Sequence, residues 1–354
     1  MKEKQKVVIL FGGRSVEHEV SLLSASNILK NIDRDIFEPI TIGIDKNGSW
    51  LEGAIPEKKF SGNPVKIDFA AKTLHSSQGN ITPDVVFPIL HGTDGEDGSI
   101  QGLFRVLNIP LVGSGVLGSA VSMDKIFSKK LLISEGLPVS PYLYFNSSEK
   151  NEIIYEKIVT QLGNPFIIKP ATLGSSVGVH KISSSEKLEY ALKDVFQYDQ
   201  NIIVEGFVKG REIECAVLGN TETRASFPGE IVVKSHYEFY TFEAKYVDGS
   251  AVDLVVPAPI SQEIAQIIMD LSKKAYKALA CEDYARVDLF LKDDGTVLIN
   301  EVNTIPGFTN ASMFPMMWAN EGINNTKLIS TLINSAVEKH KENNKLLVNF
   351  ESDL

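Results

Sequence analysis

The sequence predicts an α/β unit with a parallel sheet, followed by α+β units. Up to about residue 122, apolar strand-like runs alternate with helix-like segments, which is the pattern of parallel βαβ units. Beyond that point the alternation is lost, and two apolar runs around a polar turn predict an antiparallel hairpin near residues 286–303. A chain of 354 residues is long enough for two or three domains with their own cores.

The expected elements fall into three regions. In the first, we expect strands and helices to alternate, with strands over 7–11, 40–44, 85–90 and 109–112 and helices over 21–31 and 99–107. Residues 45–83 are rich in Gly, Ser, Lys and Pro and show no clear period. A new helix begins near Lys125, and later helices are expected over 261–279 and 326–345. These patterns predict domains over 1–122, 123–217 and 218–354, the last containing a polar stretch at 236–250.

Composition narrows the class of protein. The chain is 43% hydrophobic and 23% charged, as in soluble globular proteins. It has no apolar run near the roughly 20 residues that span a bilayer, and its first residues do not resemble a signal peptide, so we expect a cytoplasmic protein. The net charge of −10 argues against nucleic acid or an anionic membrane as the main partner. Cys215 and Cys281 match no metal or redox spacing and are expected to be buried.

The predicted hairpin gathers polar side chains on one face. Side chains alternate along strands, so a turn with an even number of residues would place Arg286 and Asp288 beside Glu301 and Asn303. The opposite face is then expected to pack on a core through Val287, Leu289, Leu291, Leu298 and Val302. Two carboxylates and an amide form a hard-oxygen cluster that suits Mg²⁺ together with substrate phosphate. The alternative is a solvated hairpin with ordinary surface charges.

Two glycine-containing segments have alternative interpretations. The segment Gly113-Ser-Gly115-Val-Leu-Gly118 fits a dinucleotide fingerprint and would suggest a dehydrogenase. Such fingerprints usually open the first βαβ unit, whereas this one closes the region. The segment from Lys169 to Gly178 is a strand end and a loop of small residues, which could close over phosphates or form a plain Gly-Ser turn. It lacks the Gly-Lys-Ser/Thr ending of a P-loop.

Acidic residues and strand-end loops complete the candidate set. Glu205 ends an apolar strand and could accept from an adenine amine, while Glu212 could hold ribose hydroxyls; a solvated turn is the alternative for both. The loops that contain Glu17 and His91 each follow an expected parallel strand, where open α/β sheets bind ligands. Together they suggest a shared cleft, although each alone could be a flexible glycine turn.

In their order along the chain, these segments resemble the D-alanine–D-alanine ligases of the ATP-grasp superfamily. The matching segments span nearly the whole chain: Phe-Gly-Gly-Arg-Ser-Val-Glu17-His-Glu, Leu-His91-Gly-Thr-Asp-Gly-Glu-Asp-Gly, Ser-Met-Asp-Lys125, Lys169-Pro through Gly-Ser175-Ser-Val-Gly, Tyr240-Thr-Phe-Glu-Ala-Lys245-Tyr246, Arg286-Val-Asp288 and Asn-Glu301-Val-Asn303-Thr-Ile-Pro-Gly307. The resemblance implies a three-domain ATP-grasp fold with a Rossmann-like N-terminal domain. It also implies that ATP phosphorylates the carboxylate of one D-alanine and that the amine of a second attacks the acyl phosphate.

The resemblance also implies roles for individual residues. The ATP-binding set would be Lys125, Lys169, Ser176, Glu205, Glu212, Lys245 and Asn303. Two Mg²⁺ (or Mn²⁺) ions would be held by Asp288, Glu301 and Asn303. Glu17 would face the ammonium of the first D-alanine, in hydrogen-bonded contact with Ser175 and Tyr246, and His91 would lie beside that substrate.

The same resemblance places the reacting carboxylate and the acceptor. Arg286 and the Gly307 N–H would hold the carboxylate oxygen through the tetrahedral intermediate, and Ser312 and Met313 would contact the second substrate. The residues at the Tyr246 and Met313 positions favour D-alanine as acceptor over D-serine or D-lactate, which same-fold ligases use. A homodimer is also implied. A nucleotide-binding regulatory protein without turnover is the alternative from another class, and the full set of lysines and metal ligands argues against it.

Overall fold

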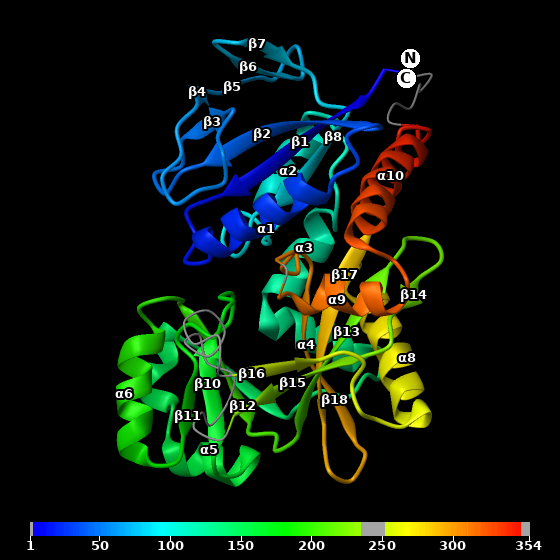
Figure 1. Cartoon of the computed structure of the whole chain (residues 1–354). Coiled ribbons are helices and arrows are strands. Elements are labelled where there is room, and N and C mark those ends of the chain that lie inside the picture. The colour runs from blue at the N-terminus through cyan, green and yellow to red at the C-terminus, as the bar shows by residue number, and fades with distance from the viewer. Residues whose placement is uncertain (1–2, 235–251, 310, 348–354) are drawn as a thin grey trace, which may run out of the picture.

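The computed structural model describes residues 3–234, 252–309 and 311–347, and its first unit is built around a parallel sheet (Figure 1). Strands β1 (Gln5–Gly12), β2 (Phe37–Ile44) and β8 (Val85–Ile89) pair in parallel with β1 in the middle. All five side chains of Val7–Phe11 are fully buried, as a strand covered on both faces requires. Helices α1 (His18–Asn31) and α2 (Ser99–Val106) confirm the predicted alternation, except that the strand expected over 109–112 is reduced to a single bridge between Val86 and Leu111.

The segment without a clear period forms short strands. Strands β3 (Trp50–Glu52) and β4 (Asn63–Pro64) extend the parallel sheet with antiparallel pairs. A separate three-stranded sheet consists of β5 (Lys66–Asp68), β6 (Thr73–Ser76) and β7 (Gly79–Ile81). Strands of two to four residues are too short to leave a readable alternation in the sequence.

The middle of the chain builds a four-stranded antiparallel sheet in the order β11-β10-β12-β9. Its strands are β9 (Tyr142–Asn146), β10 (Phe166–Pro170), β11 (His180–Ile182) and β12 (Asn201–Gly206). The helical segments in this part of the sequence are α3 (Val116–Met123), α4 (Lys125–Ser134), the 3₁₀ helix η1 (Ser147–Glu152), α5 (Tyr155–Leu162) and α6 (Ser185–Val195). Asp124 caps α4 by accepting from the N–H groups of Ile126 and Phe127, which sets the start of the helix that carries Lys125.

The C-terminal part builds a six-stranded sheet. The strands are β13 (Arg211–Leu218), β14 (Arg224–Ala225), β15 (Gly229–Val233), β16 (Val252–Val255), β17 (Tyr284–Leu291) and β18 (Val297–Asn303). Helices α8 (Gln262–Ala278) and α10 (Asn325–Asn343) confirm the two predicted helices, and α9 (Met313–Asn320), which was not predicted, lies between the hairpin and α10. Helix α10 returns to the N-terminal unit, where it packs beside α1 and β8 (Figure 1).

The hairpin of β17 and β18 has the predicted pairing, but the predicted even-length turn is wrong. Five residues, 292–296, separate the pair Leu291↔Val297, so the ladder nearest the turn has the opposite parity. A β-bulge at Asn300 then shifts the register, and Asp288 pairs with Glu301 and Arg286 with Asn303. The core face therefore carries Val297 and Ile299, and Leu298, which we expected there, is only partly buried.

The glycine segment at 113–118 serves contact between units. The N–H of Gly113 donates to the Asp283 carboxylate (2.9 Å) and that of Gly115 to the Glu282 carboxylate (3.0 Å). A Cβ on Gly118 would stand 2.3 Å from the Ala280 carbonyl oxygen, so only glycine fits there. Close packing accounts for this motif, and the dinucleotide interpretation is not needed.

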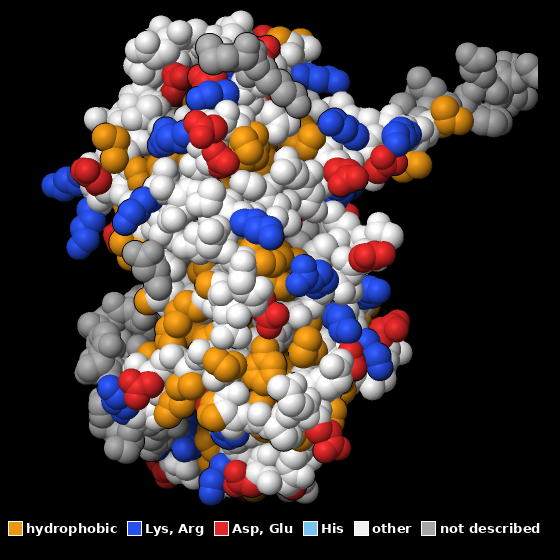
Figure 2. Space-filling model, turned by 45° about the vertical axis from the view of Figure 1, so that its right-hand side comes forward, with side chains coloured by type: hydrophobic (Ala, Val, Ile, Leu, Met, Phe, Trp, Pro, Cys, Tyr) orange, Lys and Arg blue, Asp and Glu red, His pale blue; other side chains and the backbone are white. Residues whose placement is uncertain are grey.

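The remaining composition-based expectations concern the interior and the surface. Cys215 and Cys281 are both buried, and burial raises their thiol pKa values to about 12 and about 11. On the face shown in Figure 2, Lys and Arg side chains are interspersed with Asp and Glu. Within the described part of the chain, no helix combines the length and the apolar character needed to cross a membrane.

Candidate active site

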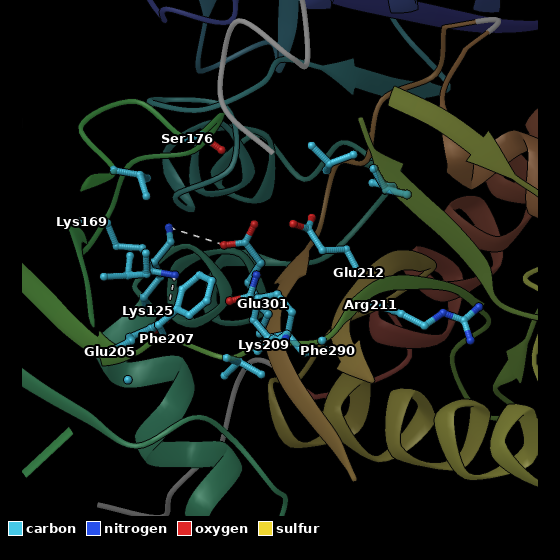
Figure 3. Close-up of a pocket in the computed structure, with 18 of the residues that line it drawn as sticks. Lys125, Lys169, Ser176, Glu205, Phe207, Lys209, Arg211, Glu212, Phe290 and Glu301 are labelled. Atoms are coloured by element: carbon cyan, nitrogen blue, oxygen red, sulfur yellow. Dashed lines mark ion pairs between the residues drawn. The ribbon is translucent and has the colours of Figure 1, made fainter. Parts of the chain in front are cut away.

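A cavity of about 440 Å³ is lined by residues from both the four-stranded and the six-stranded sheet (Figure 3). Five of the predicted ATP-binding residues line it, together with the predicted metal ligand Glu301: Lys125, Lys169, Ser176, Glu205 and Glu212. Its apolar lining includes Ile167, Phe207 and Phe290. A partly apolar cavity with lysines and acids in its wall suits a nucleotide, because the base can pack on the apolar wall while the charged groups meet phosphate and sugar.

Glu205 lies between two lysines in this wall. Its carboxylate is 3.1 Å from the Lys169 ammonium and 3.2 Å from that of Lys129, which is only 1% exposed. Burial alone would lower the pKa of Lys169, but Glu205 and Glu301 raise it above its ordinary value. For Glu205, burial opposes ionisation and the two lysines outweigh it, so its pKa is lowered. Glu205 therefore stays ionised between the two lysines.

Sequence reasoning did not include Lys129, although a signal for it existed. It follows Lys125 by four residues on α4, so both side chains project from the same helix face. The Lys129 ammonium also donates to Ser140 Oγ (3.0 Å). Its burial and two polar contacts indicate that it holds Glu205 in place.

Lys125 connects the nucleotide cavity with the hairpin. Its ammonium donates to the Leu173 carbonyl (2.8 Å), in the small-residue loop, and lies 3.8 Å from Glu301 Oε2 (Figure 3). Burial lowers the pKa of Lys125, against the opposing effect of Glu301. A bound polyphosphate would supply further negative charge to this buried ammonium.

The hairpin face brings the four predicted polar residues together. The Arg286 guanidinium donates to both Asp288 oxygens (2.6 and 2.7 Å), and Asn303 Nδ2 donates to Asp288 Oδ2 (2.9 Å). Glu214, on the neighbouring strand β13, is 3.0 Å from Arg286. Burial would lower the pKa of Arg286, but Asp288 and Glu214 raise it well above its ordinary value, so the guanidinium stays charged.

Glu214 was also absent from the sequence prediction. It follows Glu212 by two residues on one strand and pairs with Asp288, so alternation from Glu212 would have placed it on this face.

The donor set of this face fits a hard divalent cation bound together with phosphate. Asp288, Glu301 and Asn303 offer carboxylate and amide oxygens on paired strands. Among the residues that the structure describes, no group of three or more His, Cys, Asp or Glu could hold a metal by itself. Two carboxylates and an amide match Mg²⁺, which usually completes its shell with water and substrate phosphate oxygens.

A smaller cavity, of about 50 Å³, adjoins the hairpin on the side of the N-terminal unit. Its lining includes Glu17, Glu96, Ser175, Glu301 and Asn303. Ser175 donates a short hydrogen bond to Glu17, so the hydrogen bond expected from the resemblance is present. Ser175 and Ser176 both have positive φ (55° and 58°), which turns this loop sharply beside Glu17.

Glu96, which is partly buried, lines this smaller cavity, and the buried His91 lies five residues before it in the same loop. Burial, with a further contribution from Glu17, raises the pKa of Glu96 to about 8. His91 is 4% exposed, and burial lowers its pKa, so its imidazole is neutral near pH 7. Glu96 lies in the His91–Gly98 segment that suggested a ligand-binding loop, but sequence reasoning did not single it out.

The loop after β18 brings Gly307 and Ser312 together. A Cβ on Gly307 would lie 2.8 Å from Ser312 Oγ, and Ser312 Oγ accepts from the Thr309 N–H (2.9 Å). Met313 is the first residue of α9, and its side chain is 4% exposed and packs within the core. Burial leaves the Met313 side chain little surface for contact with a substrate. Lys245 and Tyr246, with the rest of the predicted lid at 236–250, lie outside the described residues.

Comparison with known proteins covers almost the whole chain. The family model for the D-ala D-ala ligase N-terminus matches residues 6–114, and that for the D-ala D-ala ligase C-terminus matches residues 131–334. A D-alanine–D-alanine ligase from Oceanobacillus iheyensis is 45% identical, over 97% of this chain and 98% of its own length. D-alanine–D-alanine ligase A from Escherichia coli K12 is 44% identical, over 97% and 99%.

Solved structures agree in fold. The D-alanine–D-alanine ligase from Coxiella burnetii superposes with a TM-score of 0.85 at 36% identity, covering 97% of this chain and 98% of its own. The VanG D-Ala:D-Ser ligase from Enterococcus faecalis gives a TM-score of 0.85 at 34% identity, covering 94% and 100%. The matching family models, the length of the sequence matches and the shared fold together establish that this chain belongs to the D-alanine–D-alanine ligase family.

Proposed function

We propose that this protein joins two D-alanines into D-alanyl-D-alanine, with cleavage of ATP to ADP and phosphate, for peptidoglycan precursor synthesis. The observation that carries the proposal is the ion pair of Lys125 and Glu301. It links a nucleotide-sized cavity lined by lysines to the hairpin face that holds Arg286 and Asp288. One continuous site thus has groups for a polyphosphate beside groups for a carboxylate.

The first step is transfer of the γ-phosphoryl group of ATP to a carboxylate oxygen of the first D-alanine. Lys125, Lys169 and Lys245 bind the phosphates, while Glu205 and Glu212 lie toward the adenine and ribose. Two Mg²⁺ ions, held by Asp288, Glu301 and Asn303, supply charge neutralisation when bound. Phosphoryl transfer needs mainly alignment and such neutralisation, so buried lysines and oxygen ligands on a rigid hairpin suit it.

The second step is attack of the amine of the second D-alanine on the acyl phosphate carbon, which expels phosphate. Glu17, which accepts a hydrogen bond from Ser175, binds the ammonium of the first D-alanine beside His91, with Tyr246 as the second expected partner of Glu17. Arg286 and the Gly307 N–H stabilise the oxygen that becomes negative in the tetrahedral intermediate. The ion pairs from Arg286 to Asp288 and Glu214 support this role, because they fix its orientation.

The acceptor is assigned to the start of α9. Ser312 occupies the N-cap position of this helix, but its side chain makes no capping hydrogen bond. First-turn N–H groups such as that of Met313 can therefore bind a carboxylate. D-serine is the second candidate acceptor, because a similar structure is a D-Ala:D-Ser ligase. We also propose a cytoplasmic homodimer of three-domain subunits. The three main sheets support three domains and a first boundary near residue 122, but β13 (Arg211–Leu218) belongs to the six-stranded sheet, so the second boundary lies before Arg211 and not at 217.

The test measures ADP release with Mg²⁺ and ATP across a panel of D-alanine, L-alanine, D-serine and D-lactate, alone and in pairs. D-Alanine alone should support the highest kcat/KM, because both substrate sites accept it. L-Alanine should give only background ADP release. Turnover that requires D-serine or D-lactate as the second substrate would reassign the acceptor site, and turnover independent of D-alanine would refute the proposal.

A further inference from the structure

The loop that carries Gly307 is held by helix α1 of the N-terminal unit. Asn27 Nδ2 donates to the Phe308 carbonyl (2.6 Å), and Ser24 Oγ accepts from the Phe308 N–H (3.1 Å). Both polar groups of one residue in the loop are thus bound by side chains that lie more than 280 positions earlier in the sequence. Ser24 and Asn27 are three residues apart on α1, so they share a helix face.

The residues that make these contacts are buried, and the Phe308 ring packs against other aromatic rings. Ser24 and Phe308 are fully buried, and Asn27 is 6% exposed. The Phe308 ring packs edge-on against Phe87 (centroids 6.2 Å apart) and near Phe314 (5.7 Å). Buried polar side chains on a helix are costly unless they are paired, and this pair binds the loop backbone.

The backbone of Gly307 is less restricted than that of its neighbours Pro306 and Phe308. Pro306 before it has a φ fixed by its ring, whereas glycine has the widest choice of φ and ψ. The Phe308 N–H belongs to the same peptide plane as the Gly307 carbonyl, so Ser24 fixes that plane directly. Fixing it restricts Gly307 and hence the direction of its own N–H.

We propose that Ser24 and Asn27 are positioning residues for the ligation, which aim the Gly307 N–H at the developing oxyanion. This inference rests on the proposed function. Ser24 Oγ also lies 3.3 Å from His91 Nε2. The same hydroxyl therefore contacts both the loop that carries Gly307 and a residue assigned to the first D-alanine. Helix α1 thereby influences the chemistry through the loop, although Ser24 and Asn27 do not contact the substrate.

The test compares Ser24→Ala, Asn27→Leu and the double variant with Ser26→Ala. Ser26 is exposed on the same helix, so its variant is the matched loss of a hydroxyl away from the loop. We expect kcat of the double variant to fall about 10- to 100-fold, the scale of weakened oxyanion donors, while the KM for ATP stays within about twofold. Ser24→Thr, which keeps the hydroxyl, should recover most of kcat.

A second readout separates positioning from folding. Affinity for a phosphinate dipeptide analogue, whose tetrahedral centre resembles the intermediate, should fall in step with kcat/KM, whereas affinity for D-alanine should change little. Equal losses for both ligands, or an unchanged kcat in the double variant, would overturn the inference. Absence of D-alanine turnover in the unmodified protein would instead refute the proposed function.

Discussion

Glu96 connects the N-terminal unit with the loop that carries Gly307, and its protonation depends on pH. It accepts from the N–H groups of Gly92 (2.7 Å) and Ile305 (3.3 Å), and burial with Glu17 nearby raises its pKa from 4.5 to about 8. A carboxyl with a raised pKa in the folded state contributes stability that is complete below about pH 4.5 and is lost as the pH rises through about 8.

We therefore expect Glu96→Gln, which mimics the neutral acid, to gain stability relative to the unmodified protein as the pH rises. The difference in unfolding free energy should grow between about pH 5 and pH 8, by at most about 1.4 kcal/mol per pH unit. Urea denaturation across this range measures it, with Glu57→Gln at an exposed position as the control. A difference that is flat with pH would show that Glu96 ionises normally.

At the residue scale, sequence reasoning found side chains that stand in recognisable motifs and missed those that only support them. Lys169 could be selected because it ends a strand before a loop of small residues, and Asp288 and Glu301 because alternation places them on one face of the hairpin. Lys129 and Glu214 belong to no sequence motif that indicates a ligand site. Their importance comes from contacts with Glu205 and Arg286, and such contacts depend on the packing of elements that the sequence does not place.

At the element scale, the β17–β18 hairpin reaches the predicted arrangement by a different route. An odd turn and a regular ladder would put Glu301 on the core side, where an unpaired carboxylate is costly. The bulge at Asn300 restores Glu301 to the cavity face opposite Asp288. Alternation alone could not reveal this, because a wrong turn parity and an unforeseen bulge cancel in the final pairing.

The hairpin yields a prediction about metal dependence. Glu301→Gln should lower kcat at least about 100-fold at low Mg²⁺ and raise the Mg²⁺ concentration that gives half-maximal rate, because a charged ligand is lost from the site. Asp293→Asn removes a carboxylate from the exposed turn of the same hairpin and is the control. An unchanged Mg²⁺ dependence in Glu301→Gln would exclude this face as the metal site.

At the scale of the whole molecule, a buried ionic junction joins the first and last parts of the chain. Asp283 is buried and accepts from the Gly113 N–H (2.9 Å), Asn220 Nδ2 (2.9 Å) and the Lys339 ammonium (2.8 Å). Lys339, on α10, also donates to the Gly113 carbonyl (2.7 Å). The glycine segment that suggested a dinucleotide fingerprint therefore anchors the N-terminal unit to the six-stranded sheet.

Lys339→Met should destabilise the protein by about 3 kcal/mol, because it leaves a buried carboxylate without its cation. Chemical denaturation measures this loss, and Lys341→Met, at an exposed position on the same helix, should change stability by less than about 0.5 kcal/mol. Similar small effects for both lysines would mean that the junction is not an energetic anchor.

The order of α/β and α+β units was predictable, because the hydrophobic period and the order of the elements depend on local sequence. The contacts between units were not, because residues 113, 283 and 339 are brought together only by the return of α10 to the N-terminal unit. The same limit applies to the site, whose parts come from every region of the chain.

In the proposed reaction, ATP activates the carboxylate of D-alanine for attack by a second D-alanine. The most direct test supplies D-alanine labelled with ¹⁸O in its carboxylate, together with Mg²⁺ and ATP, and analyses the products by mass spectrometry. Activation through D-alanyl phosphate predicts that D-alanyl-D-alanine forms and that each released phosphate carries one ¹⁸O from the carboxylate. Dipeptide formation with unlabelled phosphate, or phosphate release without dipeptide, would exclude ligation through D-alanyl phosphate.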